Sequence, residues 1–148
     1  MEWFKTRLHE NQKQVFDPVR KRYVSLTPEE EVRQQVLHTL IEDLKVPSGL
    51  TAVEYTIKLG SLVKRCDVVV FSSDHQPLLI VECKAEHIKI TQKTLDQATR
   101  YNLGLEVDFL MLSNSKTYYL FHISEGKLST CKDLLTFAEM DSLKTKTR

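Results

Sequence analysis

Two acidic residues and a lysine stand at the charged ends of two apolar runs. Asp67 directly precedes the run 68–71, and Glu82 and Lys84 close the run 78–81. Side chains at i and i+2 share one face of a strand, so Glu82 and Lys84 project side by side, and Asp67 lies near them if the two strands pair. Burying an unpaired carboxylate costs several kcal/mol, so such charges need a partner. The pattern indicates a divalent cation held by Asp67 and Glu82, with Lys84 beside the attacking water or a phosphate.

A simpler interpretation treats each of these charges as the point where a sheet edge meets water. Metal titration separates the two interpretations, because surface charges bind no cation saturably. Other kinds of site are not indicated. The histidines show no HExxH or H-x3-H spacing, the three cysteines form no CxxC pair, and there is no GxxxxGK[ST] or GxGxxG motif. We therefore expect no zinc hydrolase, disulfide framework or phosphate-binding loop.

The elements that must position these residues follow from periodicity and capping signals. Thr27 is an N-cap candidate, Pro28 fits the first helical position, and Glu30 completes a capping box before a helical apolar stripe that reaches Leu44. Strands are predicted at 53–59, 62–71, 78–84, 108–112 and 117–122, and helices at 91–103, ended by Gly104, and 133–143. The order from residue 27 to 122 is α-β-β-β-α-β-β. It predicts an α/β fold with a central mixed β-sheet flanked by helices.

Length and composition predict one globular domain over residues 1–148, with a core at 27–122, an irregular segment or β arm at 1–26, and an extension at 123–148. A formal charge of +1 means that any DNA contact must come from a local patch. No apolar window is long enough to span a membrane, and the first residues lack the apolar core of a signal peptide. We therefore expect a cytoplasmic protein without membrane contact.

The three charged residues also match a known signature. Asp67 followed by Glu82-Cys83-Lys84 resembles the D…(D/E)-x-K motif of the PD-(D/E)xK nucleases, although Cys66 replaces the usual proline before the aspartate. More narrowly, the chain resembles the N-terminal nuclease domain of type I restriction enzyme R subunits. The resembling pieces, in family order, are PEEEVRQ (28–34), KRCDVVVF (64–71), LLIVECKA (78–85), DQATRYN (96–102) and LSNSKTYYLF (112–121).

This resemblance implies a restriction-endonuclease-like fold and a DNA endonuclease that hydrolyses phosphodiester bonds with Mg²⁺ or Mn²⁺. It also implies methylase, specificity or translocase partners. An E-x-V-R pattern adds Glu30, and a Q-x3-Y pattern adds Gln97 and Tyr101. The expected catalytic residues are Asp67, Glu82, Lys84, Glu30, Gln97 and Tyr101. The expected metal ligands are Asp67, Glu82, Glu30 and the backbone carbonyl of Cys83.

Helical spacing supports Glu30, because it shares with Arg33 a stripe whose later members are apolar, so both face inward. Its capping role is an alternative that is compatible with this one. Taken alone, Gln97 and Tyr101 on an amphipathic helix would be a solvated side chain and a half-buried one.

The main alternative function is a catalytically inactive module of the same fold that binds DNA or a protein. The small size favours it, because R subunits carry a translocase beside the nuclease. Oligomeric state stays open: cutting both strands with one site per chain suggests a homodimer or two cooperating complexes.

Overall fold

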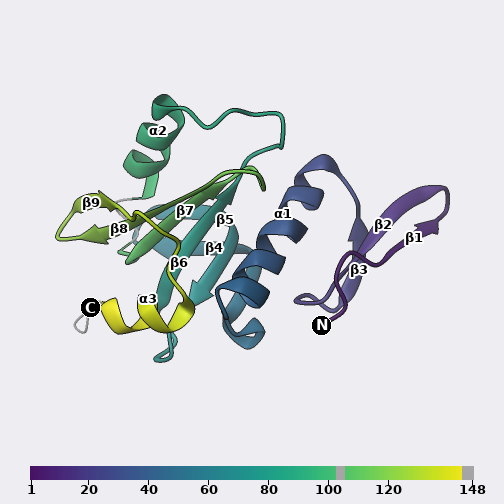
Figure 1. Ribbon diagram of the computed structural model, residues 1–148, viewed down its shortest axis with the longest axis horizontal. Coiled ribbons are helices and arrows are strands. Elements are labelled where there is room, and N and C mark those ends of the chain that lie inside the picture. Colours follow the sequence, from purple (N-terminus) through teal and green to yellow (C-terminus); the bar gives the residue numbers. More distant parts are fainter. Residues whose placement is uncertain (103–105, 145–148) are drawn as a thin grey trace.

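The computed structural model describes residues 1–102 and 106–144, apart from the side chains of Leu59, Leu62, Arg100, Tyr101 and Asn102 (Figure 1). In chain order its elements are β1 (Thr6–His9), β2 (Gln12–Asp17), β3 (Arg22–Ser25), α1 (Pro28–His38), a π-helical turn (Thr39–Asp43), a 3-10 turn (Ser48–Leu50), β4 (Thr51–Leu59), β5 (Leu62–Phe71), β6 (Pro77–Cys83), α2 (Gln92–Asn102), β7 (Phe109–Ser113), β8 (Tyr118–Ser124), β9 (Lys127–Thr130) and α3 (Phe137–Leu143). No helix in this part of the chain is long and apolar enough to cross a membrane.

A six-stranded sheet forms the centre, with the strands in the order β4-β5-β6-β7-β8-β9. All neighbours are antiparallel except β6 and β7, which pair in parallel through a crossover that contains α2. In β6 and β7 nearly every side chain is buried, as expected for strands covered on both faces. The sheet is therefore mixed, as its sequence pattern predicts.

Helices pack on both faces of this sheet, α1 and α3 on one and α2 on the other, so the core has two halves. Val36 and Leu37 of α1, with Leu40 of the π-helical turn, pack against side chains such as Val68 of β5. α2 covers the other face, where Ala98 joins a second cluster (Figure 1). On the inward side of α1, Glu30 and Arg33 precede the apolar residues Val36 and Leu37, so the helix brings these charged residues to the sheet.

A separate three-stranded antiparallel sheet, β1-β2-β3, lies on the other side of α1 from the central sheet (Figure 1). Most of its residues are exposed, but Val15 and Asp17 of β2 are buried. Trp3 anchors the start of the chain to the end of α1 by a 2.7 Å hydrogen bond from its Nε1 to Glu42. The first 26 residues thus form a β arm, and their antiparallel pairing replaces the irregular alternative.

The order α-β-β-β-α-β-β is confirmed for residues 27–122, and β5 has the predicted bounds. Three details of the prediction are wrong. The extension contains an unpredicted strand, β9, besides a helix that begins later than expected. Thr27 caps α1 through a 3.1 Å bond from the Glu30 N–H, but the Glu30 carboxylate does not complete a capping box, because it contacts two arginines instead. The predicted C-terminal residue Gly104 lies outside the described residues.

Candidate active site

Asp67 lies where β5 meets β6, one residue before the paired positions Val68 and Val81. Its Oδ2 accepts a 2.8 Å hydrogen bond from the backbone N–H of Cys83, and its Oδ1 lies 3.3 Å from Arg33 Nη2. The carboxylate is thus tied to β6 on one side and to α1 on the other. A third of the side chain remains exposed, so solvent reaches the acid beside these contacts.

Glu82 is buried close to the end of β6 and forms a 3.0 Å ion pair with Lys64 of β5. Lys84 follows the strand, and its backbone N–H continues the pairing with β7 through a 2.8 Å bond to Ser113. No ion pair among the described residues joins the half-buried Lys84 side chain to a carboxylate. Lys64, rather than Lys84, is therefore the lysine that neutralises Glu82 here.

Glu30 lies in the first turn of α1 and is 5% exposed. Its Oε1 accepts from Arg20 Nη2 at 2.7 Å and from Arg33 Nη1 at 2.8 Å, while Oε2 accepts from Gln34 Nε2 at 3.1 Å. Charged hydrogen bonds of this length are among the strongest in proteins. Both carboxylate oxygens therefore serve to hold neighbouring side chains.

The β arm supplies one of these arginines. Asp17 is fully buried at the end of β2, and its carboxylate accepts from the backbone N–H groups of Val19 and Arg20 at 2.7 and 2.9 Å. Arg20 Nε lies 2.6 Å from the other oxygen of Asp17. Charges of alternating sign therefore run from Asp17 through Arg20, Glu30 and Arg33 to Asp67.

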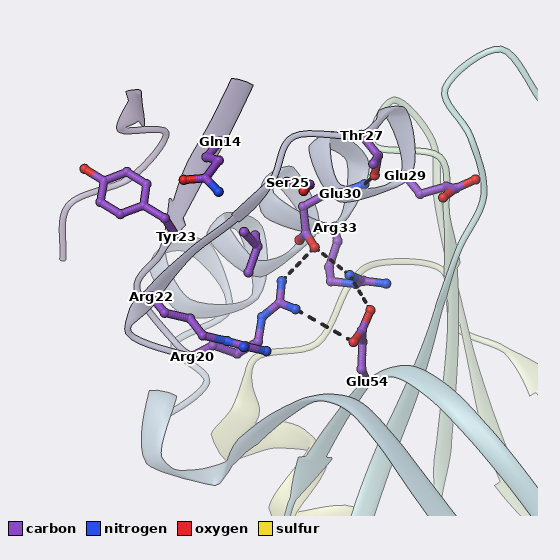
Figure 2. A pocket seen from close by; sticks show the side chains of 11 residues that line it. Gln14, Arg20, Arg22, Tyr23, Ser25, Thr27, Glu29, Glu30, Arg33 and Glu54 are labelled. Atoms are coloured by element: carbon purple, nitrogen blue, oxygen red, sulfur yellow. Dashed lines mark hydrogen bonds and ion pairs between the residues drawn. The ribbon is translucent and has the colours of Figure 1, made fainter. Parts of the chain in front are cut away.

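Glu54 of β4 completes this network from the opposite strand. It lies in β4 between Val53 and Tyr55, which pair with β5 on either side of Asp67. Its carboxylate is 3.3 Å from Arg33 and 3.2 Å from Arg65 (Figure 2 shows the Arg33 contact). The backbone of Glu54 has φ = +53°, the left-handed region that non-glycine residues rarely occupy. Among the described residues it is the one with positive φ that lies inside a helix or strand.

The network shifts the protonation of its members. Burial acts to lower the pKa of the Arg33 guanidinium, but Glu30 and Asp67 outweigh it and raise that pKa above its usual value. For Asp17, burial acts to raise the pKa, but the hydrogen bonds from Arg20 and Val19 hold it below the ordinary range. Burial raises the pKa of the Cys83 thiol and raises that of Cys66 to about 11. Both thiols are therefore neutral and unreactive near pH 7.

The structure brings some of the predicted site residues together and not others. Asp67 and Glu82 lie on neighbouring strands, and Arg33 links Glu30 to Asp67. Gln97 of α2 is exposed, and the side chain of Tyr101 lies outside the described residues. No group of three or more His, Cys, Asp or Glu side chains within residues 1–102 and 106–144 is arranged to hold a metal ion. The assignment of the ligands therefore remains a prediction.

Sequence reasoning missed Asp17, Arg20 and Glu54 as members of this network. Arg20 stands in a run of basic residues next to a proline, which is typical of a loop. Glu54 occupies an ordinary position in an alternating strand. One signal was accessible: Arg33 was predicted to face inward, and a buried arginine needs more than one acid around it.

An open pocket of about 500 Å³ lies between the β arm, α1 and Glu54. Figure 2 shows Arg20, Glu30, Arg33 and Glu54 on one of its walls, with Arg22 and Tyr23 of β3 among the other lining side chains. The charged network therefore borders solvent on this side, where Glu54 is exposed while Glu30 and Arg33 are mostly buried.

One family model matches most of the chain. Residues 28–137 match the family model described as type I restriction enzyme R protein N terminus. Comparison with curated proteins finds no match. Among solved structures, a fragment assigned as an HsdR subunit of a type I restriction enzyme from Vibrio vulnificus has a TM-score of 0.55 and 22% identity, covering 79% of this chain and 25% of that one. The chain thus spans about a quarter of that protein's length.

Two further structures show weaker similarity. A protein assigned as a nuclease from Anabaena variabilis has a TM-score of 0.48 and 9% identity, covering 96% of this chain and 93% of that one. The type IIG restriction endonuclease BpuSI has a TM-score of 0.41 and 19% identity, covering 78% and 14% of the two chains. The chain therefore shares its fold with the HsdR fragment.

Proposed function

Because the chain belongs to the family of type I restriction enzyme R protein N termini, we propose that it is a nuclease domain that hydrolyses DNA phosphodiester bonds with Mg²⁺ or Mn²⁺. It would act in the cytoplasm with methylase, specificity or translocase subunits of a restriction system. The observation that carries the proposal is the 2.8 Å bond from the Cys83 N–H to Asp67, which ties the Asp67 strand to the strand that bears Glu82 and Lys84.

The donor set fits a divalent cation. Asp67 and Glu82 offer the hard carboxylate oxygens that Mg²⁺ prefers, and the ion would compete for them with Arg33 and Lys64. When bound, the ion supplies a Lewis acid for the scissile phosphate and lowers the pKa of its water. Asp67 and Glu82 would hold it, with Glu30 and the Cys83 carbonyl as further candidate ligands.

The remaining residues have supporting roles in this proposal. Lys84 positions the attacking water or the charged phosphate, because its ammonium is not committed to a carboxylate among the described residues. Gln97 and Tyr101 of α2 would support the geometry of the substrate or of the metal site. Glu30 acts at least in part by holding Arg33 against Asp67.

A plasmid-nicking assay with calorimetric Mg²⁺ titration tests the proposal. Glu82→Gln keeps the side-chain volume but removes the charge that holds the ion, so we expect loss of both Mg²⁺ binding and cleavage. Lys84→Ala leaves the acids intact, so metal binding persists while cleavage falls about 10²–10⁴-fold. Lys127→Ala, at an exposed position of β9, is the matched control.

Equal cleavage by Lys84→Ala and the parent would make Lys84 a surface charge and end the nuclease assignment. One observation favours the alternative of an inactive module: arginine and lysine side chains already pair with Asp67, Glu30 and Glu82. That alternative predicts DNA or protein binding without nicking, and no saturable Mg²⁺ binding that Asp67→Ala abolishes.

A further inference from the structure

Arg33 lies beside the acid that is proposed to hold the cation. Its Nη2 is 3.3 Å from Asp67 Oδ1, and its Nη1 is 2.8 Å from Glu30 Oε1 and 3.3 Å from Glu54 Oε1. Three acids thus surround the Arg33 guanidinium, one each from α1, β4 and β5. A group fixed in this way is preorganised, which is what stabilising a developing charge requires.

The guanidinium has donors to spare. Arginine carries five N–H donors in a fixed fork. The Nε of Arg33 is buried and has no hydrogen-bond acceptor among the described residues, so an incoming anion does not reach it, whereas Nη2 has one close acceptor, Asp67 Oδ1 at 3.3 Å. The contacts of Arg33 with Asp67 and Glu54 are longer than the ~2.7–2.9 Å of a strong charged bond. Glu30 therefore makes the closest contact with the Arg33 guanidinium, Glu54 and Asp67 make longer ones, and Nη2 retains one N–H for an anion.

Solvent reaches the surroundings of the Arg33 guanidinium from two directions. Arg33 lines the open pocket between the β arm and α1 (Figure 2). The Asp67 and Glu54 side chains next to it are 33% and 38% exposed. An anion at Asp67 would therefore meet the Arg33 fork without opening the core.

We propose that Arg33 is a catalytic residue that donates to a non-bridging oxygen of the scissile phosphate, while Glu30 and Glu54 hold its guanidinium in place. The planar fork matches phosphate geometry, and its charge opposes the negative charge that builds up during phosphodiester hydrolysis. This inference rests on the proposed nuclease function. It assigns to Arg33 a contact with substrate, beyond its structural contact with Glu30.

The salt dependence of DNA binding tests this contact without relying on cleavage. Each phosphate contact contributes about 0.9 to the slope of log Kobs against log[salt]. We would measure binding of a duplex oligonucleotide by fluorescence anisotropy, with Mg²⁺ present, in the Lys84→Ala protein. Adding Arg33→Gln should reduce the slope by about 0.9, whereas adding Lys45→Gln, an exposed lysine beyond the far end of α1, should not change it.

Cleavage by the otherwise unchanged protein gives a second readout. Arg33→Gln should lower kcat about 10²–10³-fold even at saturating Mg²⁺. A residue that only positions Asp67 would instead raise the Mg²⁺ concentration required, and excess Mg²⁺ would restore kcat. Arg33→Lys should keep most of the salt slope, because its ammonium still releases a counterion.

An unchanged salt slope in Arg33→Gln, in a protein that binds and cleaves DNA, would overturn the inference and leave the nuclease function standing. A parent chain that neither binds nor cuts DNA would end both proposals. If Arg33→Gln alone fails to fold, the comparison is made between Glu30→Gln and the double variant Glu30→Gln/Arg33→Gln, which removes both charges of the buried pair together. The same slope difference is expected there.

Discussion

Lys64 Nζ and Glu82 Oε1 lie 3.0 Å apart on neighbouring strands, so the acid near the end of β6 is already paired with a cation of the protein itself. Asp67 has a corresponding partner in Arg33. A divalent ion that binds these acids must compete with both partners. The affinity for metal should therefore depend on side chains that are not themselves ligands.

Replacing Lys64 tests this competition. Lys64→Met keeps the apolar stem but removes the ammonium, and a hydrogen bond to a charged group contributes about 1.5–3 kcal/mol. We expect Mg²⁺ to bind Lys64→Met on the order of ten-fold more tightly than the parent, as measured by calorimetric titration. Lys127→Met is the control for loss of one positive charge. Weaker or unchanged Mg²⁺ binding by Lys64→Met would show that the ammonium does not compete.

The strained backbone of Glu54 predicts that glycine is more stable than alanine at this position, the reverse of the usual order in a strand. Glycine normally weakens a strand relative to alanine, but at φ = +53° only glycine is free of strain. Glu54→Ala and Glu54→Gly lose the same ion pairs. Glu54→Gly should therefore have the higher free energy of unfolding, by about 1 kcal/mol, in urea titrations. At Lys58, exposed in the same strand, alanine should be the more stable of the two.

The buried Asp17 carboxylate predicts that part of the free energy of unfolding is lost at acid pH. Its pKa in the folded protein is below its ordinary value of 3.8, so its stabilising contribution is fully present above that pH and is lost as the pH falls through the lower, folded-state pKa. Asp17→Asn should remove this part of the pH dependence and lower the free energy of unfolding at pH 7 by about 2 kcal/mol, because half-buried Arg20 keeps Glu30 but loses its charged hydrogen bond to Asp17.

Urea midpoints measured between neutral pH and pH 2 check this prediction. Asp43→Asn, at an exposed position in the π-helical turn, should lose stability at acid pH as the parent does. An Asp17→Asn protein that loses stability on acidification as steeply as the parent would assign this loss to other carboxylates.

Local patterns in the sequence predicted well the helices and strands that pack in the core. The stretch 62–71 becomes continuously apolar, which defines β5, and Thr27-Pro28 marks the start of α1. β9 and the β arm lack such a signal, since β1 has no buried residue and β9 has none either. Their pairing depends on partners rather than on their own apolar periodicity.

The candidate site divides in the same way. Asp67 and Glu82 could be predicted as neighbours, because two adjacent apolar runs form a hairpin and place their ends together. The Arg20 contact with Glu30 could not, because it depends on the turn after β2, which folds back on α1. The failed capping box has the same cause: two guanidinium groups offer the Glu30 carboxylate stronger bonds than a backbone N–H does.

The contact between Arg20 and Glu30 bears on where this domain can be cut. The family match begins at residue 28, yet Arg20, eight residues earlier, holds the carboxylate of Glu30 at 2.7 Å. A minimal fragment or a fusion designed from the family boundaries would keep every sequence motif of the site. It would also leave Glu30 with one arginine instead of two, and expose the side of α1 that the β arm covers. A fragment designed for engineering should therefore contain the β arm as well as the domain.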